Sequence, residues 1–266
     1  MVRGVLTALA VVASGTASFA WAGPADLAPH RAIYAMGLAT SKPGSGIAAA
    51  SGTMSYQFED SCDGYVVENR IAVNYAYTEG GQALSATDFI TWESKDGLHY
   101  RFRMRNTRDG QVTEEVEGHA DLKGKGQGGI AKFTRPENFT MPLPKGTLFP
   151  TDHTLRLIDA AQGGHRTFWK VVFDGSGLDG PYEVNALIGK QSQTLPSTLV
   201  SPLLGTPYWP MHLAFFPLSS PEEVPNFEMR LAYHPNGVAQ EIVQTFKNFS
   251  LLGKLESVEA LPRRGC

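Results

Sequence analysis

The sequence lacks the local motifs of the common catalytic and metal sites. None of its seven histidines has a partner at a recognised ligand spacing such as H-E-x-x-H. Residues 174–177 approach the G-x-S-x-G motif of serine hydrolases but lack its second spacing, and they are typical of a loop. Residues 124–129 are glycine-rich without the Gly-Lys-Ser/Thr end of a phosphate loop. We therefore predict no catalytic residues, no metal site and no cofactor.

Concentrated charge and long apolar runs are also scarce. The chain has 23 basic and 26 acidic residues, a net charge of −3 at pH 7, and no clustered basic stretch. A nucleic-acid partner is therefore not expected. Beyond the first residues, no stretch approaches the roughly 20 apolar residues that a transmembrane helix needs.

The N-terminus has the pattern of an export signal. Arg3 precedes an apolar and small-residue run over residues 5–19, and Ala20-Trp21-Ala22 fits the small-x-small cleavage rule. We predict a signal peptide over residues 1–22, and a single periplasmic β domain over residues 23–266 without a transmembrane segment.

Cysteine is nearly absent, since Cys62 and Cys266 are the only two. In an exported chain an even count favours a disulfide. The alternative is a pair of free or reactive thiols, although a catalytic pair is usually spaced C-x-x-C, which this chain lacks. The sequence leaves open whether a bridge would be purely structural or redox-responsive.

Turn-forming residues are abundant: 28 glycines and 17 prolines are scattered along the chain and favour many short strands. One helix is predicted at about 152–162, capped by Thr151 or Asp152 and stopped by Gly163-Gly164. The fold class is therefore mostly β. A boundary at 136–150 and one continuous sheet are equally compatible with the pattern. Strands are predicted at 47–58, 65–77, 86–92, 99–105, 167–173, 182–188, 211–216, 227–234, 238–249 and 251–261.

Two predicted strands carry informative faces. Along 65–77 the alternate residues form an apolar face on which Asn69 is the one polar intruder. Along 99–105, Arg101, Arg103 and Arg105 share the face opposite to Tyr100, Phe102 and Met104. The arginines either pair across strands with Glu114, Glu115 and Glu117 or form an anion site, for example for a lipid headgroup or polysaccharide.

An aromatic stretch at 207–217 suggests a binding groove. Tyr208, Trp209, Phe215 and Phe216 could line a groove for a peptide, a glycan or an acyl chain. The alternative is that these four side chains belong to the hydrophobic core.

Four segments resemble a known family. They are residues 27–34, residues 52–65 with the first cysteine, residues 149–154 before the helix, and the terminal Cys266. In these segments the chain is similar to the EipB-type periplasmic cell envelope integrity proteins of alphaproteobacteria. The resemblance implies a large antiparallel sheet curved into a spiral-like, incompletely closed barrel, a disulfide between Cys62 and Cys266, and no established catalysis.

Three functional hypotheses follow. The first is a non-enzymatic periplasmic protein that maintains envelope integrity and stress resistance by binding an envelope protein or peptide in the concavity or at the open edge of its sheet. The alternative is a lipid or lipoprotein carrier with a half-open β-barrel. The third is a hydrolase of envelope polymers, which would need a catalytic set that the sequence does not display.

Overall fold

The protein is described from a computed structural model over residues 25–193, 199–219 and 224–263. These residues form fourteen strands, one α-helix, α1 (Pro150–Gln162), and a short 3₁₀ helix, η1 (Pro202–Leu204). The strands are β1 (His30–Ser41), β2 (Ile47–Asp60), β3 (Gly64–Tyr77), β4 (Gln82–Ser94), β5 (His99–Arg108), β6 (Gln111–Leu122), β7 (Gly129–Arg135), β8 (Phe139–Leu143), β9 (Thr167–Val172), β10 (Tyr182–Ile188), β11 (Trp209–Pro217), β12 (Phe227–Tyr233), β13 (Ala239–Thr245) and β14 (Phe249–Ala260).

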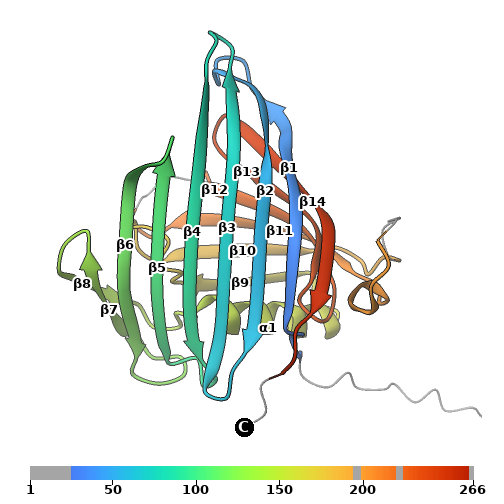
Figure 1. The fold of residues 1–266 in the computed structure, drawn as a ribbon. Coiled ribbons are helices and arrows are strands. Elements are labelled where there is room, and N and C mark those ends of the chain that lie inside the picture. The colour runs from blue at the N-terminus through green and yellow to red at the C-terminus, as the bar shows by residue number, and fades with distance from the viewer. Residues whose placement is uncertain (1–24, 194–198, 220–223, 264–266) are drawn as a thin grey trace, which may run out of the picture.

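All fourteen strands form one sheet in the order β8-β7-β6-β5-β4-β3-β2-β1-β14-β13-β12-β11-β10-β9, and every neighbouring pair is antiparallel. The sheet rolls so that β1–β6 form one wall and β9–β13 lie behind it (Figure 1). Its edge strands β8 and β9 do not pair. Leu148, between β8 and α1, makes only an isolated parallel bridge with Val172. The predicted fold, a mostly β, incompletely closed antiparallel barrel with one main helix, is confirmed.

Strand alternation decides which side chains fill the barrel. Along β1, Ala32, Tyr34 and Met36 are buried while their neighbours are more exposed. Tyr34 also donates a hydrogen bond of 2.7 Å to the carbonyl oxygen of Ala239, which ties β1 to the rear wall. Burial of each such large side chain contributes about 1.5–3 kcal/mol. The inner faces of the strands therefore form the core.

The helix begins two residues before its predicted start, because Pro150 occupies the first turn, where its missing N–H is not needed. The predicted caps Thr151 and Asp152 are wrong: the N-cap is Phe149, and no local side chain caps the helix. The Glu93 carboxylate on β4 instead accepts hydrogen bonds from the backbone N–H groups of Thr151, at 2.6 Å, and Asp152, at 2.8 Å. A distant strand thus supplies the cap.

The two ends of the barrel differ. At the lower end in Figure 1 the helix lies between the walls, where Leu157 and Ala161 pack against β9–β12 and Ile158 packs with Leu27 and Phe58. We call this the closed end. The opposite, open end is built from strand ends and turns, including residues 42–46, 78–81 and 246–248.

Three further predictions concern a domain boundary, a membrane-spanning helix and the signal peptide. The strands on both sides of residues 136–150 belong to one sheet that is continuous through β1. No helix within the described residues is long and apolar enough to cross a membrane. The predicted signal peptide lies outside the described residues.

Candidate functional sites

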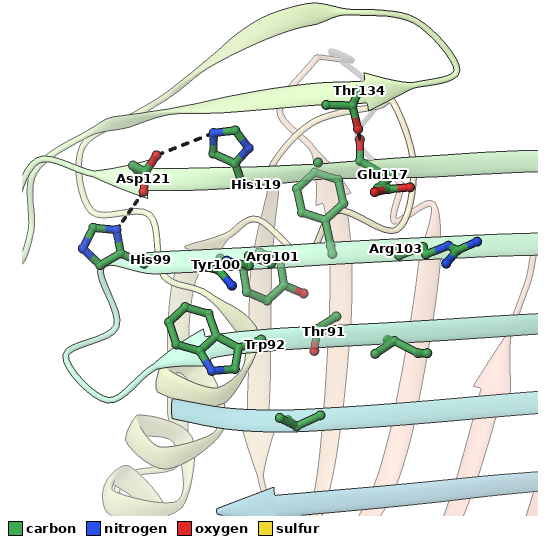
Figure 2. Close-up of a pocket in the computed structure, with 14 residues that line it drawn as sticks. Thr91, Trp92, His99, Tyr100, Arg101, Arg103, Glu117, His119, Asp121 and Thr134 are labelled. Atoms are coloured by element: carbon green, nitrogen blue, oxygen red, sulfur yellow. Dashed lines mark hydrogen bonds and ion pairs between the residues drawn. The ribbon is translucent and has the colours of Figure 1, made fainter. Parts of the chain in front are cut away.

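Two of the three predicted arginines, Arg101 and Arg103, line a shallow hollow on the outer face of the barrel, over β3–β7 (Figure 2). The hollow has a volume of about 780 Å³. The guanidinium of Arg101 lies over the ring of Trp92, 4.9 Å from its centroid. Figure 2 shows Asp121 between two histidines: its carboxylate is 2.7 Å from His99 Nδ1 and 4.0 Å from His119 Nε2.

Acidic residues face the arginines across the β5–β6 pairing. Arg103 lies opposite Glu117 and Arg105 opposite Glu115, as the cross-strand interpretation predicts. The closest oxygen of Glu115 lies 3.6 Å from Arg105 Nε. Arg135 on β7 also contacts Glu115, and its Nε lies 3.5 Å from Glu117. The hollow therefore has mixed charge, and the anion-site interpretation stays a prediction.

The four aromatic residues predicted to form a groove are not brought together on one surface. Trp209 is buried and Phe215 packs against the same interior cluster as Trp209. Phe216 follows on the other side of β11. Tyr208 lines an outer hollow of about 480 Å³ over β10–β13, beside Pro210 and the exposed Leu187.

The structure instead assembles a different aromatic series, which we call the aromatic rim. Its ring centroids are separated in turn by 5.9, 4.9, 5.4, 5.3 and 6.3 Å. All six side chains are partly exposed, and Phe246 keeps 36 % of its surface exposed. The members are Tyr75, Phe249, Phe246, Phe227, Phe215 and Tyr182, in spatial order.

Part of the aromatic rim lies at the open end, where Tyr75 precedes the turn at 78–81 and Phe246 and Phe249 flank the β13–β14 turn. From there the series runs to Tyr182, which pairs with Val172, and Val172 bridges Leu148 just before α1. Tyr182, Phe227 and Phe249 are the first residues of β10, β12 and β14. Tyr75 and Phe215 lie near the ends of β3 and β11, and Phe246 follows β13. Of these six, sequence reasoning had found only Phe215 as a binding residue. Aromatic residues at the ends of neighbouring strands could have revealed the rim. Recognising them as neighbours requires the order of the strands in the sheet, which the sequence does not provide.

The structure describes one of the two cysteines that are predicted to pair. Cys62 lies in the β2–β3 connection, while Cys266 lies outside the described residues. The C-terminal segment does reach this region: Arg263 lies 3.2 Å from the Asp60 carboxylate and 2.6 Å from that of Asp26. The approach is compatible with a bridge, and the Cys62–Cys266 disulfide stays a prediction.

Metal chemistry finds no support in the described part of the chain, where no three His, Cys, Asp or Glu side chains are grouped to hold an ion. Residues 174–177 lie between β9 and β10, where the Asp174 carboxylate accepts hydrogen bonds from both the backbone N–H and the hydroxyl of Ser176. The nearest approach to a serine-hydrolase motif is thus in a connecting loop.

Comparisons with known proteins agree with this architecture. A family model described as EipB-like matches residues 21–262. The chain is 30 % identical to the cell envelope integrity protein EipB of Brucella abortus (strain 2308), over 94 % of each protein. It is also similar to the crystal structure of a β-barrel-like protein of a domain of unknown function from Brucella abortus. That similarity has a TM-score of 0.84 and 28 % identity, and covers 90 % of this chain and 100 % of the other.

Proposed function

The chain belongs to the EipB-like family, and from this premise we propose that it maintains the integrity of a bacterial cell envelope by binding an envelope protein or peptide at the open end of its barrel. It acts in the periplasm as a non-enzymatic protein. The named relative supports the envelope role. The site at the open end rests on the aromatic rim.

The aromatic rim is suited to apolar protein segments. Aromatic side chains provide large apolar areas at little conformational cost and dominate the energetics of many interfaces. Six of them in one continuous series that begins at the open end, all partly exposed, form a surface that binding would bury. The rings are held by contacts with one another and by the strand ends, so little ordering is needed on binding.

A specific observation also favours a second function, that of a lipid or lipoprotein carrier. A hollow of about 240 Å³ at the open end is lined by Tyr75, Phe249 and Ala83, with Arg108 beside them. Arg108 donates a hydrogen bond of 2.9 Å to the Tyr77 hydroxyl. This combination suits an acyl chain with an anionic headgroup. A carrier would co-purify with lipid, which mass spectrometry of the extracted protein would detect.

The deep interior argues against the carrier as the first choice. An acyl chain that extended toward the closed end would cover the side-chain oxygen of Asn69, which is buried and has no hydrogen-bond partner among the described protein groups. Leaving such an atom unpaired costs about 1–3 kcal/mol. A peptide that inserts only a few apolar side chains at the rim avoids this cost.

Matched variants in a strain that lacks the native protein test the proposal. Phe227→Ala with Phe249→Ala trims the aromatic rim, and Trp169→Ala with Leu187→Ala trims exposed apolar residues of the outer wall, which are 60 % and 61 % exposed. We expect detergent sensitivity to return only with the rim variant while both proteins accumulate to normal levels. Full rescue by the rim variant would contradict the proposal.

A further inference from the structure

A separate cavity lies deeper in the barrel, near the closed end. Its volume is about 230 Å³, below the roughly 300–1,000 Å³ of pockets for drug-sized ligands. It therefore suits a ligand with a single ring. The lining comes from the N-terminal segment, β1–β5, α1 and β12, and its side chains are mainly aromatic or uncharged polar, including Tyr56, Phe89 and Tyr233, with His30, Asn69 and Thr154.

Two acceptor atoms among the lining residues have no hydrogen-bond partner within the described protein. One is His30 Nε2 and the other is Asn69 Oδ1. His30 is only 2 % exposed, and its Nδ1 lies 2.7 Å from the carbonyl oxygen of Ala28. Since a carbonyl only accepts, Nδ1 carries the hydrogen and Nε2 presents a lone pair. Burial lowers the pKa of His30, which favours this neutral form. Both unpartnered atoms therefore need a donor.

The absence of charged side chains in the described lining further limits which ligands fit the cavity. None of the described residues that line the cavity is Asp, Glu, Lys or Arg. Although Thr151 lines the cavity from the first turn of α1, its backbone N–H already donates to Glu93. An ion would lose its hydration here without a counter-charge, which is costly. A wholly apolar ligand would leave both acceptors unpaired, which is also costly. The ligand is therefore uncharged and donates hydrogen bonds.

The walls of the cavity limit the shape of the ligand, because aromatic rings enclose much of the cavity. His30 and Tyr56 have ring centroids 5.5 Å apart, and Phe58 lies 6.3 Å from His30. Such rings favour a ligand with flat apolar faces. A sugar ring combines C–H faces with hydroxyl donors at its edge. We propose that this cavity binds one uncharged sugar unit, with His30 and Asn69 accepting hydrogen bonds from its hydroxyl groups.

The site is reachable and independent of the rim. Tyr56, Asn69, Phe89 and Tyr233 are partly exposed although their strands direct them inward, so they are exposed toward the hollow interior. A free sugar and the end of a glycan share the recognised chemistry. The cavity can be tested without knowledge of what the rim binds.

The experiment uses the purified mature protein and saturation-transfer difference NMR. The probes are glucose, galactose, mannose and N-acetylglucosamine, with glucuronic acid and glucosamine as charged controls. We expect saturation transfer to at least one neutral sugar and none to the charged pair. A short oligosaccharide of the sugar that binds distinguishes a glycan end, which would bind more tightly, from a free monosaccharide.

A matched pair of variants locates the binding. Asn69→Leu removes one acceptor, and Asn74→Leu changes an amide on the outer side of the same strand, where Asn74 Nδ2 donates to Gln82 at 2.9 Å. We expect Asn69→Leu to weaken binding at least tenfold without lowering the melting temperature, and Asn74→Leu to leave binding unchanged. Absence of transfer to all four neutral sugars, or equal binding by Asn69→Leu, would overturn the proposal and assign the cavity to structural water only.

Discussion

The carboxylate of Glu93 on β4 accepts a hydrogen bond of 2.6 Å from the backbone N–H of Thr151, in the first turn of α1. Glu93 is only 2 % exposed. Residues 58 positions apart in sequence are thereby joined at the closed end. The single helix is thus held both by its apolar side chains and by a buried acid in the sheet.

This relationship predicts a pH dependence of stability. Burial raises the pKa of the Glu93 carboxyl to about 7 from 4.5, although the two backbone hydrogen bonds oppose the shift. The folded state thus keeps the proton to higher pH than the unfolded chain. The contribution of Glu93 to stability is complete below about pH 4.5 and is lost as the pH rises through about 7.

The Glu93→Gln variant isolates this effect, because glutamine does not titrate. The free energy of unfolding of the wild type minus that of the variant should fall between pH 5 and pH 8, as measured by urea denaturation. A difference that rises over this range would show that the folded pKa of Glu93 lies below 4.5 and would contradict the prediction.

For His153 on α1 we predict the opposite dependence of stability on pH. Burial lowers its pKa to about 4 from 6.5, and its ring packs against Phe168 with centroids 5.6 Å apart. Its contribution to stability is present above about pH 6.5 and is lost as the pH falls through about 4.

A His153→Leu variant should therefore lose less stability than the wild type between pH 6.5 and pH 4. At pH 8 it should melt at the same or a higher temperature, since the substitution removes a buried Nε2 without a partner in the described protein. Thermal melts across this pH range make the comparison. Parallel curves for the two proteins would refute it.

The sequence specified most strands but not all of them. Strands 182–188 and 65–77 were found within one residue, because their alternation and turn signals agree. β1, β7 and β8 were missed. β8 has only five residues and contains Pro142, which suits an edge strand but weakens the pattern. The predicted strand 238–249 is present as β13 but was drawn too long, since the chain turns after Thr245 and begins β14 at Phe249.

The β5–β6 hairpin shows what local pattern cannot supply. Its turn pairs Arg108 with Gln111, and a register shift between Asn106 and Thr107 then moves the pairing by one residue. Such a shift exchanges the faces of a strand. It places Glu117 and His119 on the arginine side. The helix cap and the aromatic rim were unpredictable for a related reason, since both depend on residues far apart in the chain.

The core and the aromatic rim should respond differently to truncation. Phe133 is 2 % exposed and stacks on Phe139 with centroids 4.2 Å apart, so Phe133→Ala should cost about 3–5 kcal/mol of unfolding free energy. Phe227 is partly exposed, and Phe227→Ala should cost about 1–2 kcal/mol. Urea denaturation of both variants checks this. An equal cost would mean that the rim is core and is not available for binding.

The proposed Cys62–Cys266 bridge would close a loop of about 200 residues, for which the chain-entropy model gives an upper value of about 5 kcal/mol. The mature protein should gain two hydrogens in mass on reduction and melt at a markedly lower temperature. The Cys62→Ser variant should melt like the reduced wild type. Free thiols in protein isolated from its native compartment, or melting unchanged by reduction, would contradict a structural bridge.

Site-specific photo-crosslinking in intact cells tests whether an envelope protein binds at the open end. A photoreactive phenylalanine replaces either Phe246 on the aromatic rim or Trp169 on the outer wall, which are 36 % and 60 % exposed. We predict a discrete protein adduct from position 246 that disappears with Phe227→Ala and is absent from position 169. Adducts from position 169 alone, or from neither position, would contradict it.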